Sequence, residues 1–185
     1  MDFKKIIEAH EEAVAGLKKD CLPELKIMAE ICRQAIKNGH KILLCGNGGS
    51  AADSQHIAAE FVGRFVKERK GLPAIAFTTD TSILTAIGND YGYDEVFRRQ
   101  VDAIGREGDV LIGISTSGNS GNVVKAFEQA KKQGMKILAL TGHKESKMSA
   151  LADVAIKVPA PITARVQECH IMIGHMICEY IDEEY

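Results

Sequence analysis

Hydrophobic and polar positions follow two different rhythms along this chain. Up to Gly39, apolar side chains recur every three or four residues, which is the spacing of an amphipathic helix. The repeat between Phe3 and Leu17 predicts one helix. Pro23 can open a second helix, and Gly39 supplies its stop. We therefore expect two helices ahead of the rest of the fold.

Beyond Gly39, short apolar runs alternate with segments of helical pattern along the chain. The runs show little alternation of apolar and polar residues, which is typical of strands covered on both faces. The predicted strands are residues 41–45, 74–77, 109–114, 136–141 and 154–158. The predicted helices are residues 51–65, 81–87, 95–104, 122–133 and a last one from about 163 to about 183. This order predicts an α/β protein with a doubly wound parallel sheet and right-handed crossovers.

Length and composition bound the class of protein. The chain has 185 residues, 45% of them hydrophobic and 26% charged, which suits one domain with a substantial core. No linker or repeat divides it, so we expect a single domain over residues 1–185. The helices within about residues 1–38 would pack on the core or on a partner subunit. The formal net charge of −2 and the absence of Trp give no reason to expect nucleic acid or a membrane as a partner.

The cysteines and the first residues bear on the compartment. The five cysteines form no Cys-x-x-Cys pair, which predicts reduced and mostly buried thiols at Cys21, Cys32, Cys45, Cys169 and Cys178. The N-terminal residues carry too many charges for a signal peptide, and no apolar run approaches the roughly 18–20 residues of a membrane span. We expect a soluble cytoplasmic protein.

A glycine-rich turn follows the first predicted strand. Asn47, Gly48 and Gly49 lie between that strand and a segment of good helix formers. A helix N-terminus gathers unpaired N–H groups and the positive end of the helix dipole, so this turn is suited to an anion. Ala51 stands where a dinucleotide-binding fingerprint has its third glycine, which weakens that alternative without excluding it.

A second strand-to-helix turn repeats this logic with hydroxyl groups. Ser115, Thr116, Ser117 and Ser120 follow the apolar run 109–114. Hydroxyl donors, backbone N–H groups and a helix dipole converge there, which favours a phosphate. The segment does not have the Walker pattern. The alternative is that these residues serve only as helix caps and turns.

Two helices carry residues suited to metal binding or acid–base chemistry. His56 and Glu60 share one face of a mostly apolar helix, which favours a buried or cleft-facing pair over a solvated one. On the last helix, Gln167 and His175 lie about 80° apart around the axis and could lean into one site. His170 points in another direction and is interpreted as a core or interface histidine. Spacing alone leaves open whether the two pairs meet.

Several segments together resemble the phosphoheptose isomerases, which are the sedoheptulose 7-phosphate isomerases of the sugar isomerase (SIS) superfamily. They are residues 45–53, the His56/Glu60 helix, 78–82, 86–91, 114–120, and 164–170 with His175. The likeness spans essentially the whole chain, in order. It implies a three-layer, flavodoxin-like SIS fold with a five-stranded parallel sheet and extra N-terminal helices. It also implies a homotetramer with active sites at subunit interfaces, and one zinc ion per subunit.

The resemblance assigns roles to positions in this sequence. The implied zinc ligands are His56, Glu60, Gln167 and His175. The implied contacts to a phosphorylated sugar are Asn47, Gly48, Gly49, Glu60, Asn89, Asp90, Ser115, Thr116, Ser117, Ser120 and Gln167. Ala164 stands where some relatives carry an acidic residue, which leaves one secondary polar contact in doubt. For Asn89 and Asp90 the alternative is a loop or helix-cap pair.

The implied activity is the conversion of sedoheptulose 7-phosphate to D-glycero-D-manno-heptose 7-phosphate through an enediol(ate). We expect Glu60 and His175 to form the catalytic acid–base pair. The implied pathway is nucleotide-activated heptose synthesis, for lipopolysaccharide core or another surface polysaccharide. One alternative is a non-catalytic SIS module that binds a sugar phosphate or a replication-initiation protein. The other is an SIS enzyme acting on hexose or amino-sugar phosphates.

Overall fold

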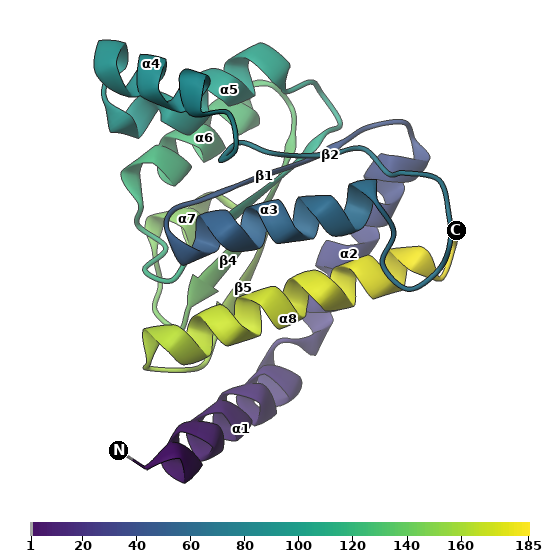
Figure 1. Ribbon diagram of the computed structural model, residues 1–185, viewed down its shortest axis with the longest axis vertical. Coiled ribbons are helices and arrows are strands. Elements are labelled where there is room, and N and C mark those ends of the chain that lie inside the picture. The colour runs from purple at the N-terminus through teal and green to yellow at the C-terminus, as the bar shows by residue number, and fades with distance from the viewer. Residues whose placement is uncertain (1) are drawn as a thin grey trace.

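Five parallel strands form the centre of the computed structural model, which describes residues 2–185 (Figure 1). The strands are β1 (Ile42–Gly46), β2 (Ala74–Ala76), β3 (Val110–Ser115), β4 (Lys136–Gly142) and β5 (Val154–Val158). The helices are α1 (Phe3–Asp20), α2 (Leu22–Lys37), α3 (Gly49–Val62), α4 (Thr81–Tyr91), α5 (Val96–Ile104), α6 (Gly121–Lys132), α7 (Lys147–Leu151) and α8 (Thr163–Asp182). A short 3₁₀ turn, Tyr93–Glu95, precedes α5. The predicted α/β class with a five-stranded parallel sheet is confirmed.

The strand order is β2-β1-β3-β4-β5, and every neighbouring pair is parallel. In this order the chain reverses its direction of travel across the sheet between β1 and β3. Open α/β sheets bind ligands in the crevice at the carboxyl ends of the strands at such a switch point. The two turns singled out in the sequence follow β1 and β3, so both lie at this crevice.

Two helical layers cover the sheet and account for its continuous apolar strands. Ile42 and Leu44 of β1 pack with residues of α2, α3 and α8 in one core. Leu43 and Cys45 of the same strand pack with residues of α5, α6 and α7 in the other. Successive side chains of a strand point to opposite faces, and here both faces are dry, so both positions must be apolar. Gly113 of β3 lets α6 approach, because a Cβ there would lie 2.4 Å from the Phe127 ring.

Some helix ends differ from their predicted positions. The helix predicted over residues 51–65 begins earlier, at Gly49, and ends at Val62. At this end the Arg69 side chain donates a hydrogen bond to the carbonyl oxygen of Phe61. The helix predicted over 81–87 continues to Tyr91 and stops at Gly92, whose φ of +88° suits glycine. The sequence did not predict α7, a five-residue helix.

Helices α1 and α4 lie at opposite ends of the molecule (Figure 1), and both leave apolar side chains exposed. In α1, Phe3 and Ile7 are 72% and 59% exposed, and burial is confined to the later residues Ala13 and Leu17. In α4, no residue is buried, although its sequence is apolar. Within residues 2–185, no helix combines the length and apolarity required to cross a bilayer.

Candidate functional site

The serine loop, residues 115–120, forms a cluster of hydroxyl groups at the carboxyl end of β3. The Ser115 Oγ lies 2.9 Å from the Ser120 Oγ and 3.3 Å from the Ser117 Oγ. Gly118 has a φ of +64°, and its N–H returns to the Ser115 carbonyl at 3.0 Å, which closes the turn. Because Ser120 makes no side-chain cap to α6, its hydroxyl stays directed into the cluster. The loop therefore presents several donors around one point at a helix N-terminus.

The glycine loop, residues 46–49, has a similar form at the end of β1. Gly48 precedes α3 with a φ of +55° and provides no side-chain cap, so the first N–H groups of α3 have no side-chain partner there. Gly46 packs closely, because a Cβ there would lie 2.7 Å from the Ser50 carbonyl oxygen. Helices α3 and α6 follow the neighbouring strands β1 and β3, so their N-termini face the same crevice. This arrangement suits a phosphorylated ligand.

A side-chain pair that the sequence did not predict ties the two loops together. The Asn47 Nδ2 donates to the Asn122 Oδ1 at 2.9 Å, and the Asn122 Nδ2 donates to the Asn47 Oδ1 at 2.8 Å. The Tyr93 hydroxyl donates to the same Asn47 oxygen at 3.2 Å. Asn122 is only 3% exposed, so its amide is fixed in place. The only sequence signal was an Asn in the first turn of a helix after the serine loop.

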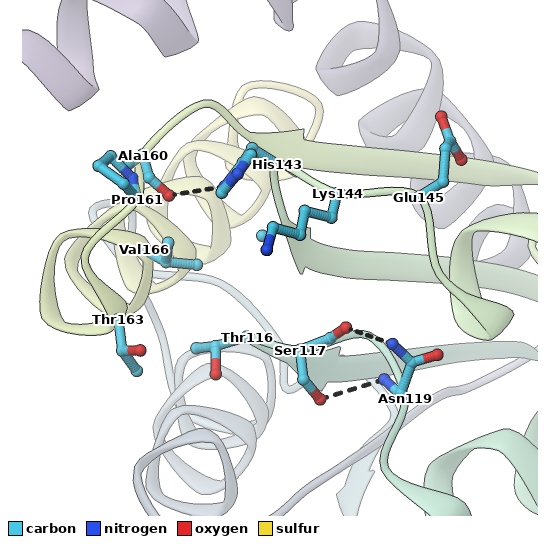
Figure 2. A pocket seen from close by; sticks show the side chains of 11 residues that line it. Thr116, Ser117, Asn119, His143, Lys144, Glu145, Ala160, Pro161, Thr163 and Val166 are labelled. Carbon is cyan, nitrogen blue, oxygen red and sulfur yellow. Dashed lines mark hydrogen bonds between the residues drawn. The ribbon is translucent and has the colours of Figure 1, made fainter.

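A cavity of about 340 Å³ lies beside the serine loop, between the ends of β3, β4 and β5 (Figure 2). Thr116 and Ser117 line one side, and His143 and Lys144 of the loop after β4 line the other. Figure 2 shows the Lys144 side chain extending into the space between these two loops. Lys144 adds a cation near the hydroxyl cluster, and no sequence pattern pointed to it.

Helices α3 and α8 bring three of the predicted catalytic and metal-binding residues together. The His56 Nε2 lies 2.9 Å from the His175 Nε2 and 3.3 Å from the Glu60 Oε1. The Phe65 ring packs on His175 with 5.5 Å between ring centroids. Helices α3 and α8 can approach this closely because Gly174 has no side chain: a Cβ there would lie 2.5 Å from the Ile57 Cδ1. Within one chain, His56 therefore contacts both Glu60 of its own helix and His175 of α8.

The His56/Glu60 pair is not buried within the chain. The side chains of His56 and Glu60 are 50% and 26% exposed, because the apolar residues around them on α3 face the sheet and α8 instead. The neighbouring Asp53 has one carboxylate oxygen that is buried without a hydrogen-bond partner. Burial raises the pKa of Asp53, against the lowering effect of His56.

Gln167 lies apart from these three residues. Its amide packs against the start of α3, where a Cβ on Gly49 would lie 2.6 Å from the Gln167 Nε2. Gly49 and His56 are seven residues apart on α3, roughly 10 Å along the axis. Gln167 therefore faces the glycine loop, which suits its predicted contact with a sugar better than a shared position with His175.

The three clustered residues match the donor chemistry of a zinc site. Ligands about 2.0–2.1 Å from a tetrahedral zinc lie roughly 3.3 Å from each other. The His56–Glu60 separation agrees with this value, and the His56–His175 separation is slightly shorter. Among residues 2–185, no three His, Cys, Asp or Glu side chains already converge as a metal-binding group. The residues therefore fit a metal by donor type and by the two separations measured from His56.

The remaining predicted residues take separate positions. Asn89 and Asp90 are exposed in the last turn of α4, and their side chains bond to each other at 2.9 Å. Among residues 2–185, no hydrogen bond joins these two side chains to the serine or glycine loop. His170 is fully buried and bonds through its Nε2 to the Thr141 carbonyl at 3.1 Å, so it is the core histidine that was expected. All five cysteines are free and buried, as predicted.

The doubly wound parallel sheet, with two helix N-termini at its switch point, defines a class of α/β protein suited to phosphorylated small molecules. A family model of the SIS domain matches residues 7–142. The phosphoheptose isomerase of a Nitratiruptor species is 61% identical over 182 residues, which cover 98% of this chain and 97% of that protein.

Solved structures extend the same relationship. The phosphoheptose isomerase from Neisseria gonorrhoeae is 50% identical with a TM-score of 0.88, and the match covers 98% of this chain and 95% of that one. The phosphoheptose isomerase from Francisella tularensis is 36% identical with a TM-score of 0.95, over 98% and 96% of the two chains. The chain belongs to the phosphoheptose isomerases of the SIS domain family.

Proposed function

We propose that this chain is an aldose–ketose isomerase that converts sedoheptulose 7-phosphate to D-glycero-D-manno-heptose 7-phosphate. This reaction is the first step of nucleotide-activated heptose synthesis, for lipopolysaccharide core or another surface polysaccharide. Family membership over nearly the whole chain supports the assignment. The observation that carries it is the contact of His56, on the same helix as Glu60, with His175 of a distant helix.

Isomerisation moves one proton between two carbons and redistributes the carbonyl group. In our proposal the Glu60 carboxylate takes a proton from C1, while an N–H group of the His175 ring gives its proton to the C2 carbonyl oxygen. The product of this first half of the reaction is an enediol. His175 then takes the proton from the C1 oxygen, and Glu60 returns its proton to C2, which yields the aldose and restores both side chains. His56 holds His175 through the 2.9 Å contact of their Nε2 atoms.

The serine loop would act at a distance from the reacting carbons. Its hydroxyls and the N-terminus of α6 would bind the phosphate, and Lys144 would add positive charge beside them. Binding energy from this remote group would align C1 with Glu60. Gln167 and the glycine loop would contact the sugar hydroxyls, with Asn47 held by Asn122.

We also propose one zinc ion per subunit, held by His56, Glu60 and His175. The family resemblance adds Gln167 to this ligand set, although in this chain the Gln167 amide lies against the start of α3, away from the other three. Bound there, zinc would polarise the sugar carbonyl and stabilise the charge that develops on its oxygen. The nitrogen and oxygen donors of these side chains support zinc. Metal analysis of protein purified without chelator tests this proposal, and a metal-free but fully active preparation would contradict it.

The assembly and compartment are proposals as well. Exposed apolar residues on α1 and α4 support a homotetramer, and the exposed face of His56 and Glu60 supports an active site completed by a partner subunit. Five free cysteines support a cytoplasmic location, where thiols stay reduced.

Incubation with sedoheptulose 7-phosphate, followed by NMR, tests the function directly. We expect the manno-heptose 7-phosphate to form, and Glu60→Gln to lower turnover by about 10²–10⁴-fold because the base is lost. Affinity for the sugar phosphate, measured by calorimetry, should stay within about tenfold. Glu179→Gln, an exposed change on α8, is the matched control. Near-native turnover in Glu60→Gln would remove Glu60 from the mechanism. Binding of the sugar phosphate by the wild type without turnover would instead support a non-catalytic module.

A further inference from the structure

A buried ion pair joins the ends of the two helices that carry the candidate catalytic groups. The Arg69 Nε donates to the Asp182 Oδ1 at 2.5 Å, and the two side chains are only 1% and 2% exposed. Asp182 is the last residue of α8. Arg69 lies in residues 63–73, the irregular segment between α3 and β2.

The Arg69 guanidinium also holds the last turn of α3. It donates to the carbonyl oxygen of Glu60 at 3.0 Å and to that of Phe61 at 2.9 Å. Helix ends leave carbonyl groups without intrahelical partners, and here one side chain satisfies two of them. Arg69 therefore contacts the backbone of Glu60 itself while it is paired with α8.

Asp182 completes the arrangement from the other side. Its Oδ2 accepts from the backbone N–H groups of Val66 and Lys67 at 2.8 and 3.1 Å. This fixes the segment that carries Phe65, whose ring packs on His175. One carboxylate thus links α8 to the segment following α3, and one guanidinium links that segment back to α3.

We propose that Arg69 and Asp182 form a positioning pair that sets Glu60 and His56 of α3 against His175 of α8. The inference rests on the isomerase function proposed above. The pair lies at the Val62 end of α3, whereas the glycine loop lies at the Gly49 end, roughly 20 Å away. The pair therefore does not reach the glycine loop. Removing it should therefore change the chemical step far more than the binding of the phosphate.

A stabilising role alone does not account for this geometry. Burying two charges costs desolvation energy, and apolar residues of similar volume are often equally stable in such a place. What apolar residues lack is a planar set of donors that reaches two helices at once. Lysine keeps the charge but concentrates its donors at one point, so Arg69→Lys tests the geometry with the charge retained.

The test compares Arg69→Lys and Asp182→Asn with wild type, and with Arg98→Lys as the control. Arg98 is ion-paired to Glu95 on the opposite face of the sheet. We expect either change to lower kcat on sedoheptulose 7-phosphate by about 10²-fold, since small misplacements of catalytic groups have effects of this size. KM should stay within about threefold, and the double variant should lose little more than either single one, because the two residues act as a unit.

Histidine ring signals give a second readout that does not depend on turnover. Ring resonances of His56 and His175 should shift in both variants and stay unchanged in Arg98→Lys. If one variant fails to fold, the other still decides the question. Wild-type kcat with unmoved ring signals in a folded variant would overturn the proposal, as would a rise in KM that accounts for the whole loss of kcat/KM. A wild type that does not isomerise sedoheptulose 7-phosphate contradicts the proposed function, and the ring signals still test the positioning role.

Discussion

At the scale of single residues, Asn122 has the clearest predicted effect on substrate binding. It makes two hydrogen bonds with Asn47, which is part of the glycine loop. Asn122→Ala removes both, so the loop should lose its fixed position relative to the serine loop. We expect KM for the phosphorylated sugar to rise by about tenfold, equivalent to 1.4 kcal/mol, with a smaller change in kcat.

Tyr93→Phe is the graded control for this prediction. It removes only the 3.2 Å bond to the Asn47 oxygen and leaves the amide pair intact. Steady-state kinetics of the two variants should therefore show a small effect for Tyr93→Phe and a larger one for Asn122→Ala. Equal KM values in wild type and Asn122→Ala would show that the pair does not order the binding loops.

His170 should make the stability of the protein depend on pH. Burial lowers the pKa of His170 to about 4, while its bond to the Thr141 carbonyl acts in the opposite direction. Between this pKa and the usual 6.5, the unfolded chain binds a proton that the folded chain does not. The free energy of unfolding should therefore fall as pH falls from 6.5 to 4, by about 3 kcal/mol in total.

Urea denaturation at several pH values measures this dependence. His170→Gln keeps a donor for Thr141 but cannot titrate, so its stability should vary much less over the same window. His143→Gln alters an exposed histidine and should retain the wild-type profile. A His170→Gln profile parallel to that of wild type would place the titrating group elsewhere.

At the scale of elements, the packing of α3 on α8 depends on a glycine. A Cβ on Gly174 would lie 2.5 Å from the Cδ1 and 2.6 Å from the Cγ1 of Ile57, which is buried. Gly174→Ala should therefore push the two helices apart and lower the free energy of unfolding by about 1–3 kcal/mol. Because His56 and His175 flank this contact, kcat should fall as well.

A glycine-to-alanine substitution in α4 should have the opposite effect on the free energy of unfolding. A Cβ on Gly88 meets nothing within 4 Å, so Gly88→Ala gains helix propensity without a clash. We expect it to raise the free energy of unfolding by up to about 1 kcal/mol. Denaturant titrations of the two variants should move in opposite directions from wild type. Stabilisation by both would mean that the α3–α8 contact can relax around an added methyl group.

The elements differ in how far the sequence could predict them. Strands such as β3 and β5 were predicted to within one residue at each end, because strands buried on both faces need unbroken apolar runs. The short α7 was missed, since five residues show no periodicity and its Ser146/Ser149 capping box is a weak signal.

The candidate site was predictable only in its local parts. The serine and glycine loops are continuous segments, so residue types and order were enough to find them. His56 and His175 are 119 residues apart, and only the packing of α3 on α8 makes their nitrogen atoms meet. The Asn47–Asn122 pair joins two loops that are distant in sequence, which no periodicity reveals.

At the scale of the whole molecule, the apolar surface of α1 bears on assembly. Phe3 and Ile7 lie on the helix face that carries its apolar residues, and both are exposed. Ile7→Glu adds a charge to this face without touching either core. If the face packs against another subunit, sedimentation velocity should show smaller species than for wild type, with unchanged circular dichroism. Turnover should fall in the same samples, because the proposed active site needs a partner subunit.

Lys5→Glu provides the matched change on the same helix. Lys5 lies about 160° around α1 from Ile7, on the polar face, so a glutamate there should leave the assembly intact. An Ile7→Glu protein with wild-type mass and turnover would show that α1 is not an interface. If the variant dissociated but kept full activity, assembly through α1 would stand, and each active site would have to be complete within one chain.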